Sequence, residues 1–200
     1  DSISEPGVYQ AIVKAKLGIT TVNNYGVSGT YVSKRDESDT TAMCTRISSM
    51  AGGADLNTVY GGINDFIGSY GGGDLGDISS TALTTFYGAL KSIAVYLLTN
   101  YPTATNVFIT PIKCGGYVSG VTGLTWYYDT PNAGGHVLAD YANAIKEVGA
   151  KYSIPVLDLF SLSGIETTNI NYMTSDKLHP GTIGYQRIAT LMANFFSSLG

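Results

Sequence analysis

The chain has 200 residues, 44% of them hydrophobic and 13% charged, and its formal net charge is −4. This length is typical of one domain with a sizeable core, so we expect a single domain over residues 1–200. The chain has no run of Lys or Arg and no stretch of 18 apolar residues. These absences argue against a nucleic-acid partner and a membrane span. The composition is compatible with secretion or a cell-surface location but fixes neither the compartment nor the oligomeric state.

Helix and strand patterns alternate along the chain. Apolar residues at helical spacing predict a first helix over residues 8–15, and the run 19–29 then predicts a buried strand that ends in a glycine-rich turn. The same patterns predict further helices over 41–50, 83–98 (with Ser79 or Ser80 as N-cap), 138–152 and 188–199, and strands over 54–62, 106–112 and 154–160. Apolar strands that alternate with helices indicate a parallel sheet covered on both faces.

Ligands of such sheets bind beyond the carboxyl ends of the strands, where this chain carries several residues suited to catalysis. Gly29 and Asn64 follow two of the predicted strands, and Asp176 and His179 precede a helix that we expect to begin at Pro180. A serine hydroxyl needs a base such as His, and a carboxylate orients that base. Backbone N–H groups and an amide side chain are the donors that an oxyanion requires.

Four blocks in this order, "DSIS", "NNYGVSG", "GGIND" and "DKLHP", resemble the blocks of SGNH hydrolases, also called GDSL-type esterases and lipases. The resemblance implies a three-layer α/β/α, flavodoxin-like parallel sheet with strand order 2-1-3-4-5. It implies Ser2 as nucleophile, His179 as general base and Asp176 as its orienting acid. It also implies an oxyanion hole formed by the N–H groups of Ser2 and Gly29 and by the Asn64 side chain. No metal or organic cofactor is needed.

The first block departs from the family pattern, in which a buried strand and a glycine precede Asp-Ser. Only four strands are predicted here, and the central strand 1 is not among them. Its neighbours would then face a slot two strand spacings wide, about 9–10 Å. We therefore expect a strand of about five or six residues, ending in Gly beside Asp1, to be truncated from or supplied from outside the printed sequence. A cleaved piece, a second chain or residues outside this numbering are the alternatives.

Several other residues have simpler interpretations. Cys44 and Cys114 lack metal-ligand spacing and are expected to be buried thiols, although a single bridge is an alternative. His136 is expected near a helix start without a catalytic role. Ser28 does not form a G-x-S-x-G elbow, because Thr30 stands where the second Gly is required. The glycine-rich stretch 70–77 is expected to be a flexible loop; its Asp74 and Asp77 lack further cation ligands, and no metal site is predicted.

The stretch 114–135 is long for a connection between a strand and a helix, and long loops are often functional. It carries Tyr117, Trp126, Tyr127 and Tyr128 on the side where the active site is expected. These rings could form a wall for a sugar ring or an acyl group. Alternatively, they pack the loop onto the domain.

The leading hypothesis is a serine ester hydrolase that works through an acyl-enzyme on a small-molecule or polysaccharide ester. Loops rich in Tyr, Gly and Thr, without an obvious apolar lid, favour short-acyl esters, especially acetyl esters of carbohydrate. A lipase or thioesterase of the same family is the nearest alternative. A non-catalytic carbohydrate-binding module on the same scaffold is the alternative from another class, because the first block is incomplete.

Overall fold

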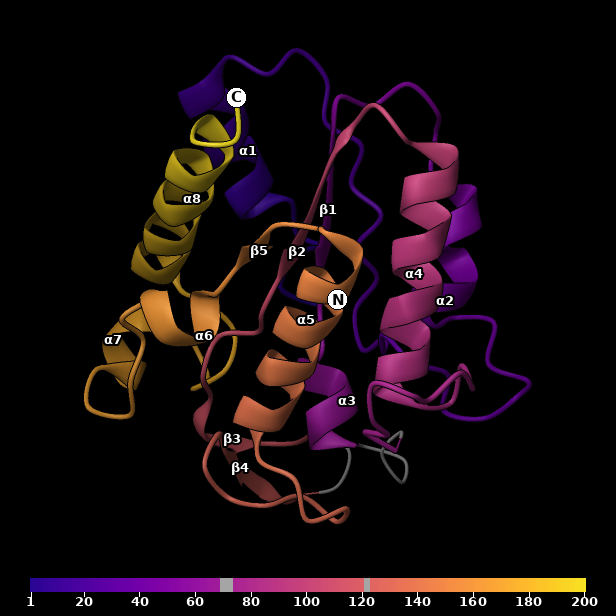
Figure 1. The fold of residues 1–200 in the computed structure, drawn as a ribbon. Helices are drawn as coiled ribbons and strands as arrows, with labels where there is room; N and C mark the ends of the chain where they lie inside the picture. Colours follow the sequence, from indigo (N-terminus) through magenta and orange to yellow (C-terminus); the bar gives the residue numbers. More distant parts are fainter. Residues whose placement is uncertain (69–73, 121–122) are drawn as a thin grey trace.

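A parallel sheet lies at the centre of the protein (Figure 1). The computed structural model describes residues 1–68, 74–120 and 123–200. Among these, β1 (Leu56–Tyr60), β2 (Thr105–Ile109) and β5 (Val156–Leu157) form the sheet in the order β1-β2-β5. Leu56 pairs with Thr105, and Phe108 pairs with Val156. All three strands were predicted from their apolar runs.

Helices cover both faces of the sheet, which confirms the predicted three-layer α/β/α class. On one face, α1 (Val8–Leu17) packs against α8 (Thr182–Ser197) over a cluster that includes Val107 and Ile109 of β2. On the other face, α4 (Phe86–Asn100) packs against α5 (Leu138–Tyr152) over Phe108. Neighbouring β2 residues therefore enter opposite cores, as the alternation of side chains along a strand requires.

The shorter elements lie around these layers. They are α2 (Met43–Arg46), the 3₁₀-helix η1 (Ile47–Ser49), α3 (Ile63–Ile67), α6 (Leu159–Leu162) and α7 (Ile170–Met173). The carboxyl ends of the strands point to the end of the molecule where α3 lies (Figure 1). An antiparallel pair, β3 (Gly115–Val118) and β4 (Thr125–Tyr127), lies at the same end.

The prediction that residues 19–29 form a strand of the sheet is wrong. Residues 21–27 belong to no helix or strand, and most of the run 19–29 is exposed. An apolar, β-prone run forms a strand only when a neighbouring backbone is in reach to pair with it. Here a groove separates the run from β1.

Some predicted boundaries also need correction. The helix predicted to begin at residue 83 begins at Phe86. Its N-cap is Thr85 and not Ser79 or Ser80, because the Thr85 hydroxyl accepts a hydrogen bond from the Gly88 N–H. Pro180 does not begin the last helix, because α8 starts at Thr182; Pro180 instead forms a bridge with Thr174. The predicted helix 41–50 is divided between α2 and η1.

The two cysteines are free and buried, so the alternative of a bridge between them is wrong. Burial raises the pKa of Cys114 to about 12, which keeps that thiol neutral. Within the described ranges, no helix is long and apolar enough to cross a membrane.

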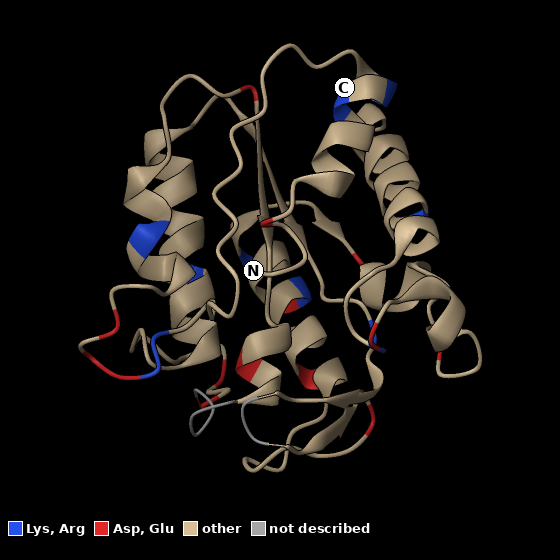
Figure 2. Ribbon diagram, turned by 180° about the vertical axis from the view of Figure 1, so that it is seen from behind, with Lys and Arg blue, Asp and Glu red and all other residues tan. Residues whose placement is uncertain are grey.

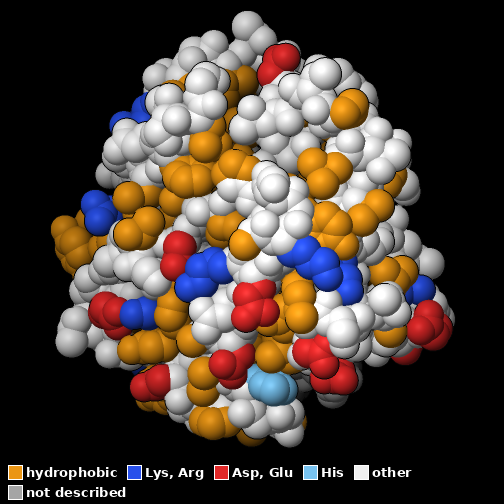
Figure 3. All heavy atoms as spheres, in the orientation of Figure 1, with side chains coloured by type: hydrophobic (Ala, Val, Ile, Leu, Met, Phe, Trp, Pro, Cys, Tyr) orange, Lys and Arg blue, Asp and Glu red, His pale blue; other side chains and the backbone are white. Residues whose placement is uncertain are grey.

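Charged residues are dispersed over the ribbon rather than gathered in one band (Figure 2). In the space-filling view, Lys and Arg side chains lie close to Asp and Glu, with apolar and polar side chains interspersed (Figure 3). Lys146 Nζ, for example, lies 3.3 Å from Asp158 Oδ2, and Lys113 pairs with Glu166. Opposite charges are thus balanced locally on this surface.

Candidate active site

Ser2, His179 and Asp176 form a continuous chain of hydrogen bonds. Ser2 Oγ lies 2.9 Å from His179 Nε2, and His179 Nδ1 lies 2.6 Å from Asp176 Oδ2. Ser2 and His179 are 177 positions apart in the sequence and are brought together by the fold. With the Nδ1 proton directed to the carboxylate, Nε2 is free to accept the serine proton, which is the arrangement that activates a hydroxyl nucleophile.

The turn between Asp176 and His179 holds the imidazole and the carboxylate in register. Asp176 Oδ1 accepts the backbone N–H groups of Leu178 at 3.1 Å and His179 at 2.7 Å. Lys177 between them has φ 72°, a left-handed conformation that is rare for a residue with a side chain. The Ser175 N–H closes the loop by donating to the His179 carbonyl at 2.8 Å. This short turn therefore holds the His179 imidazole through backbone hydrogen bonds as well as through the Asp176 side chain.

The ionisation of Asp176 follows from its partners. Partial burial alone raises the pKa of this carboxyl group, but the hydrogen bonds from the His179 side chain and backbone outweigh it, and the pKa is lowered from its ordinary value. Asp176 is therefore an anion at neutral pH. An anion at this position favours the Nδ1–H tautomer and stabilises an imidazolium that forms during a reaction.

The turn that carries Ser2 is also fixed by local bonds. Asp1 Oδ1 accepts the Ile3 N–H at 3.0 Å, and the Asp1 carbonyl accepts the Ser4 and Glu5 N–H groups. Ile3 is fully buried, and its carbonyl accepts from the Tyr185 hydroxyl at 3.2 Å. Ser2 therefore leaves a tight, anchored turn, with its hydroxyl directed at His179.

The glycine-rich turn of the second block lies against this first turn. A Cβ on Gly26 would lie 2.6 Å from the Glu5 nitrogen, so only glycine allows the two backbones to approach so closely. Asn24 Nδ2 also donates to the Ser4 carbonyl at 2.8 Å. Gly29, farther along this turn, has φ 71°, a conformation that glycine adopts without strain.

Asn64 joins the second and third blocks. It lies in α3, directly after β1, and its Nδ2 donates to the Thr30 carbonyl at 2.9 Å. One Nδ2 hydrogen makes this bond, and the second remains for another acceptor. The N–H groups of Ser2 and Gly29 have no protein acceptor among the described residues. Donors of these types are what an oxyanion needs.

Asp65 is a site-supporting residue that the sequence analysis missed. Its fully buried carboxylate accepts the Val32 N–H, the Ser33 N–H and the Ser33 hydroxyl at 2.6–2.9 Å. Burial raises the pKa of Asp65, and these hydrogen bonds oppose that effect. The contacts fasten the chain just after Gly29 to α3. The sequence feature that could have identified Asp65 is its position as an acidic residue directly after Asn64 in "GGIND".

Of the four predicted wall residues, Tyr117 is the one whose ring contacts the triad. It lies 6.0 Å from the His179 ring in an edge-to-face arrangement. Trp126 packs edge-to-face on Phe66, 5.8 Å away, and the Tyr128 hydroxyl lies 3.3 Å from Glu166. Tyr127 is exposed on β4. The contacts of Trp126 and Tyr128 favour packing of the loop onto the domain, and the loop itself contains the unpredicted β3–β4 pair.

The remaining candidate residues take no part in the hydrogen bonds described above for Ser2, Asp176 and His179. His136 precedes α5, with Nδ1 3.7 Å from Asp140 Oδ2, and Ser28 is exposed. Residues 70–73 of the predicted flexible loop lie outside the described ranges. Asp74 and Asp77 accept hydrogen bonds from nearby Gly76 and Ser79. In the described part of the chain, no cluster of three or more His, Cys, Asp or Glu residues could hold a metal ion.

An α/β sheet with a Ser–His–Asp chain at the carboxyl end of its strands has the architecture of a serine hydrolase. A model of the GDSL-like Lipase/Acylhydrolase family matches residues 2–187. The chain belongs to this family, which confirms the resemblance drawn from its four blocks. Family membership supports ester hydrolysis.

Solved structures agree with this assignment. A protein from Lactobacillus plantarum is 30% identical, with a TM-score of 0.82 over 95% of this chain and 87% of the other. A possible lipase from Chitinophaga pinensis is 22% identical, with a TM-score of 0.77 over 96% and 88%. The acetyl xylan esterase AlAXEase is 16% identical, with a TM-score of 0.62 over 100% and 96%, and shares the fold. No curated protein matches the sequence significantly.

Proposed function

We propose that this protein is a serine ester hydrolase in which Ser2 is the nucleophile, His179 the general base and Asp176 the residue that orients His179. The observation that carries the proposal is the pair of hydrogen bonds from Ser2 Oγ to His179 Nε2 and from His179 Nδ1 to Asp176 Oδ2. This geometry suits proton transfer from the hydroxyl to the imidazole.

The first half-reaction acylates Ser2. Ser2 Oγ attacks the ester carbonyl carbon while His179 Nε2 takes the hydroxyl proton. The carbonyl oxygen becomes an oxyanion, which the N–H groups of Ser2 and Gly29 and the Asn64 amide stabilise. The imidazolium then gives its proton to the leaving alkoxide, the C–O bond breaks, and the alcohol leaves.

The second half-reaction releases the acid. His179 takes a proton from a water molecule, whose oxygen attacks the acyl carbon of the ester on Ser2. The same donors stabilise the second oxyanion, and the imidazolium returns the proton to Ser2 Oγ as the acyl group leaves. Both steps use only side chains and backbone groups of this chain and water.

We propose short-acyl esters of carbohydrate, especially acetyl esters, as the substrate class. The Tyr117 ring beside His179 offers a flat face of the kind on which a sugar can stack. AlAXEase, a neighbour in fold, is an acetyl xylan esterase. A lipase or thioesterase is the alternative, and a series of esters from acetyl to about twelve carbons distinguishes them. Faster hydrolysis of the long esters would contradict the acetyl preference.

A fluorophosphonate probe tests the mechanism separately from the substrate, because it needs only an activated serine. We expect covalent labelling at the peptide that contains Ser2, and no labelling in Ser2→Ala or after denaturation. Ser28→Ala is the matched control and should label normally. A folded wild-type protein that does not label would favour the non-catalytic carbohydrate-binding module.

A further inference from the structure

The turn that carries Asp176 and His179 contains a residue in an unfavourable backbone conformation. The turn is closed at its base, where Thr174 and Pro180 form a backbone bridge. Inside it, Lys177 has φ 72°, in the left-handed region. Residues with a side chain rarely adopt this conformation, because Cβ comes close to the following carbonyl oxygen. Such a conformation persists only where surrounding contacts hold it.

The hydroxyl of Thr174 makes one of these contacts. Thr174 is buried, with 5% of its surface exposed. Its Oγ1 donates to the Ile170 carbonyl at 2.5 Å and accepts the Lys177 N–H at 3.0 Å. A hydroxyl group has one hydrogen to donate and lone pairs with which to accept. The bond to Ile170 therefore directs the hydroxyl proton to α7 and leaves a lone pair for the Lys177 N–H.

The carbonyl of Lys177 is held from the other side. It accepts the N–H of Gly115, the first residue of β3, at 3.0 Å. Both backbone groups of Lys177 are thus bonded to other segments of the chain, whereas its side chain is exposed. The contacts that fix this residue are therefore those of its backbone.

The backbone of Lys177 determines how the carboxylate and the imidazole face each other, because it lies between them in the chain. Asp176 Oδ1 accepts the N–H groups of Leu178 and His179, the two residues that follow Lys177. A change of φ at Lys177 would rotate these N–H groups away from Asp176. It would also displace His179 Nδ1 from Asp176 Oδ2, which now lies 2.6 Å away.

We propose that Thr174 is a positioning residue for the catalytic base. Its hydroxyl holds Lys177 in the left-handed conformation and thereby keeps His179 aligned with Asp176 and Ser2. Thr174 acts through the turn and not on the substrate. Its effect on catalysis rests on the proposed ester hydrolysis, but the alignment of His179 with Asp176 can be measured separately.

Thr174→Val is the first test, because valine keeps the branched shape and loses both hydrogen bonds. We expect kcat on an acetyl ester to fall roughly five- to tenfold, with little change in KM, as the aligned turn becomes less populated. Thr174→Ser keeps the hydroxyl and should keep most of the activity. Thr190→Val is the matched control, since the Thr190 hydroxyl also donates to a carbonyl four residues earlier, that of Gln186, but on the exposed side of α8.

A second pair of variants distinguishes a role through the backbone of Lys177 from other effects. In a Lys177→Gly chain, glycine adopts φ 72° without strain, so adding Thr174→Val should lower kcat by about twofold or less. In a Lys177→Ala chain the charge is also lost but the strain remains, so Thr174→Val should lower kcat as much as in the parent chain. Equal losses in the glycine and alanine chains would overturn the proposal.

Proton NMR measures the alignment without a substrate. The short bond between His179 Nδ1 and Asp176 Oδ2 should give a far-downfield proton resonance in the parent chain. We expect this resonance to move upfield or broaden in Thr174→Val and to stay unchanged in Thr190→Val. An unchanged resonance and an unchanged kcat in folded Thr174→Val would overturn the proposal. Failure of the parent chain to label with a fluorophosphonate would instead contradict the proposed hydrolysis.

Hydrogen exchange in the parent chain provides a test that does not depend on the folding of Thr174→Val. The Lys177 amide belongs to an exposed residue but donates to a buried hydroxyl. We expect this amide to exchange at least about tenfold more slowly than in the unfolded chain. Exchange of the Lys177 amide at the rate of the unfolded chain would show that Thr174 does not hold the turn, and would overturn the proposal.

Discussion

At the scale of single residues, the pH dependence of ester hydrolysis tests the proposed base. Hydrogen bonds from His179 lower the pKa of Asp176 despite partial burial, so this carboxylate is ionised at neutral and mildly acidic pH. A loss of activity in acid must then come from the imidazole, which has to be neutral to accept a proton. We expect kcat/KM on a neutral ester to fall as the pH is lowered below neutral, because protonation of the imidazole removes the acceptor for the serine proton.

His136→Ala should leave that profile intact, because His136 lies beside Asp140, which is not a member of the triad. Asp176→Asn should lower kcat over the whole pH range, by roughly 10⁴, as expected when the imidazole loses the group that fixes its tautomer. A flat profile between pH 5 and 8 in the wild-type protein would contradict the assignment of His179 as base.

Asn64→Ala tests the oxyanion hole at one residue. The amide donates to the Thr30 carbonyl with one hydrogen and is proposed to stabilise the oxyanion with the other. Its loss should reduce kcat by roughly 10²–10³ with a smaller effect on KM, since the donor acts mainly in the transition state. Steady-state kinetics on an acetyl ester measures this. Circular dichroism checks that the fold survives, and unchanged kcat in a folded variant would remove Asn64 from the mechanism.

The site residues could be selected from the sequence because their chemistry is tied to short blocks. Asp176, Leu178 and His179 bond within one turn, so four consecutive residues encode their geometry. Asp65 was missed because its partners Val32 and Ser33 lie more than 30 residues away. Contacts of that kind arise only when the chain folds.

At the scale of elements, Asp65 connects α3 with the segment after Gly29 that contains Val32 and Ser33. In Asp65→Asn an NH₂ group replaces one of the two oxygens, so either the Val32 N–H or the Ser33 N–H loses its acceptor and remains as a buried, unpaired donor. We expect a loss of about 1–3 kcal/mol in the free energy of unfolding. We also expect lower kcat, because the Gly29 turn is no longer held beside Asn64.

Asp36→Asn is a matched control, since the exposed Asp36 carboxylate bonds only within its own turn to Ser38. Urea unfolding of both variants measures the difference. Equal stability of Asp65→Asn and the parent chain would show that the buried bonds do not hold this element.

The hairpin and the helix starts show where patterns along the chain were insufficient. β3 and β4 are four and three residues long and rich in Gly, Thr and Tyr, so they produce no apolar run. The start of α4 depends on Thr85, whose hydroxyl accepts from the Gly88 N–H, although serines at 79 and 80 are equally good caps by residue type. Local composition indicates the region in which a helix or strand begins, and contacts made in the folded chain determine the residue at which it begins.

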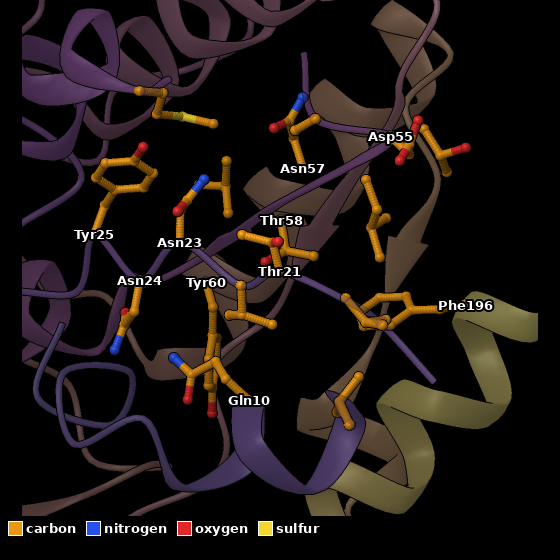
Figure 4. A pocket seen from close by; sticks show the side chains of 18 of the residues that line it. Gln10, Thr21, Asn23, Asn24, Tyr25, Asp55, Asn57, Thr58, Tyr60 and Phe196 are labelled. Atoms are coloured by element: carbon orange, nitrogen blue, oxygen red, sulfur yellow. The ribbon is translucent and has the colours of Figure 1, made fainter. Parts of the chain in front are cut away.

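At the scale of the whole molecule, the order of layers was predictable because long apolar helices and strands must cover one another. The edge of the sheet was not predictable from the sequence, because a run of residues forms a strand only when a neighbouring strand can pair with it. Residues 19–29 have the composition of a strand but carry no strand pairing, and residues 19–26 line the groove beside β1 (Figure 4). A strand-like composition therefore does not by itself make a strand, because the backbone also needs a neighbour in reach with which it can pair.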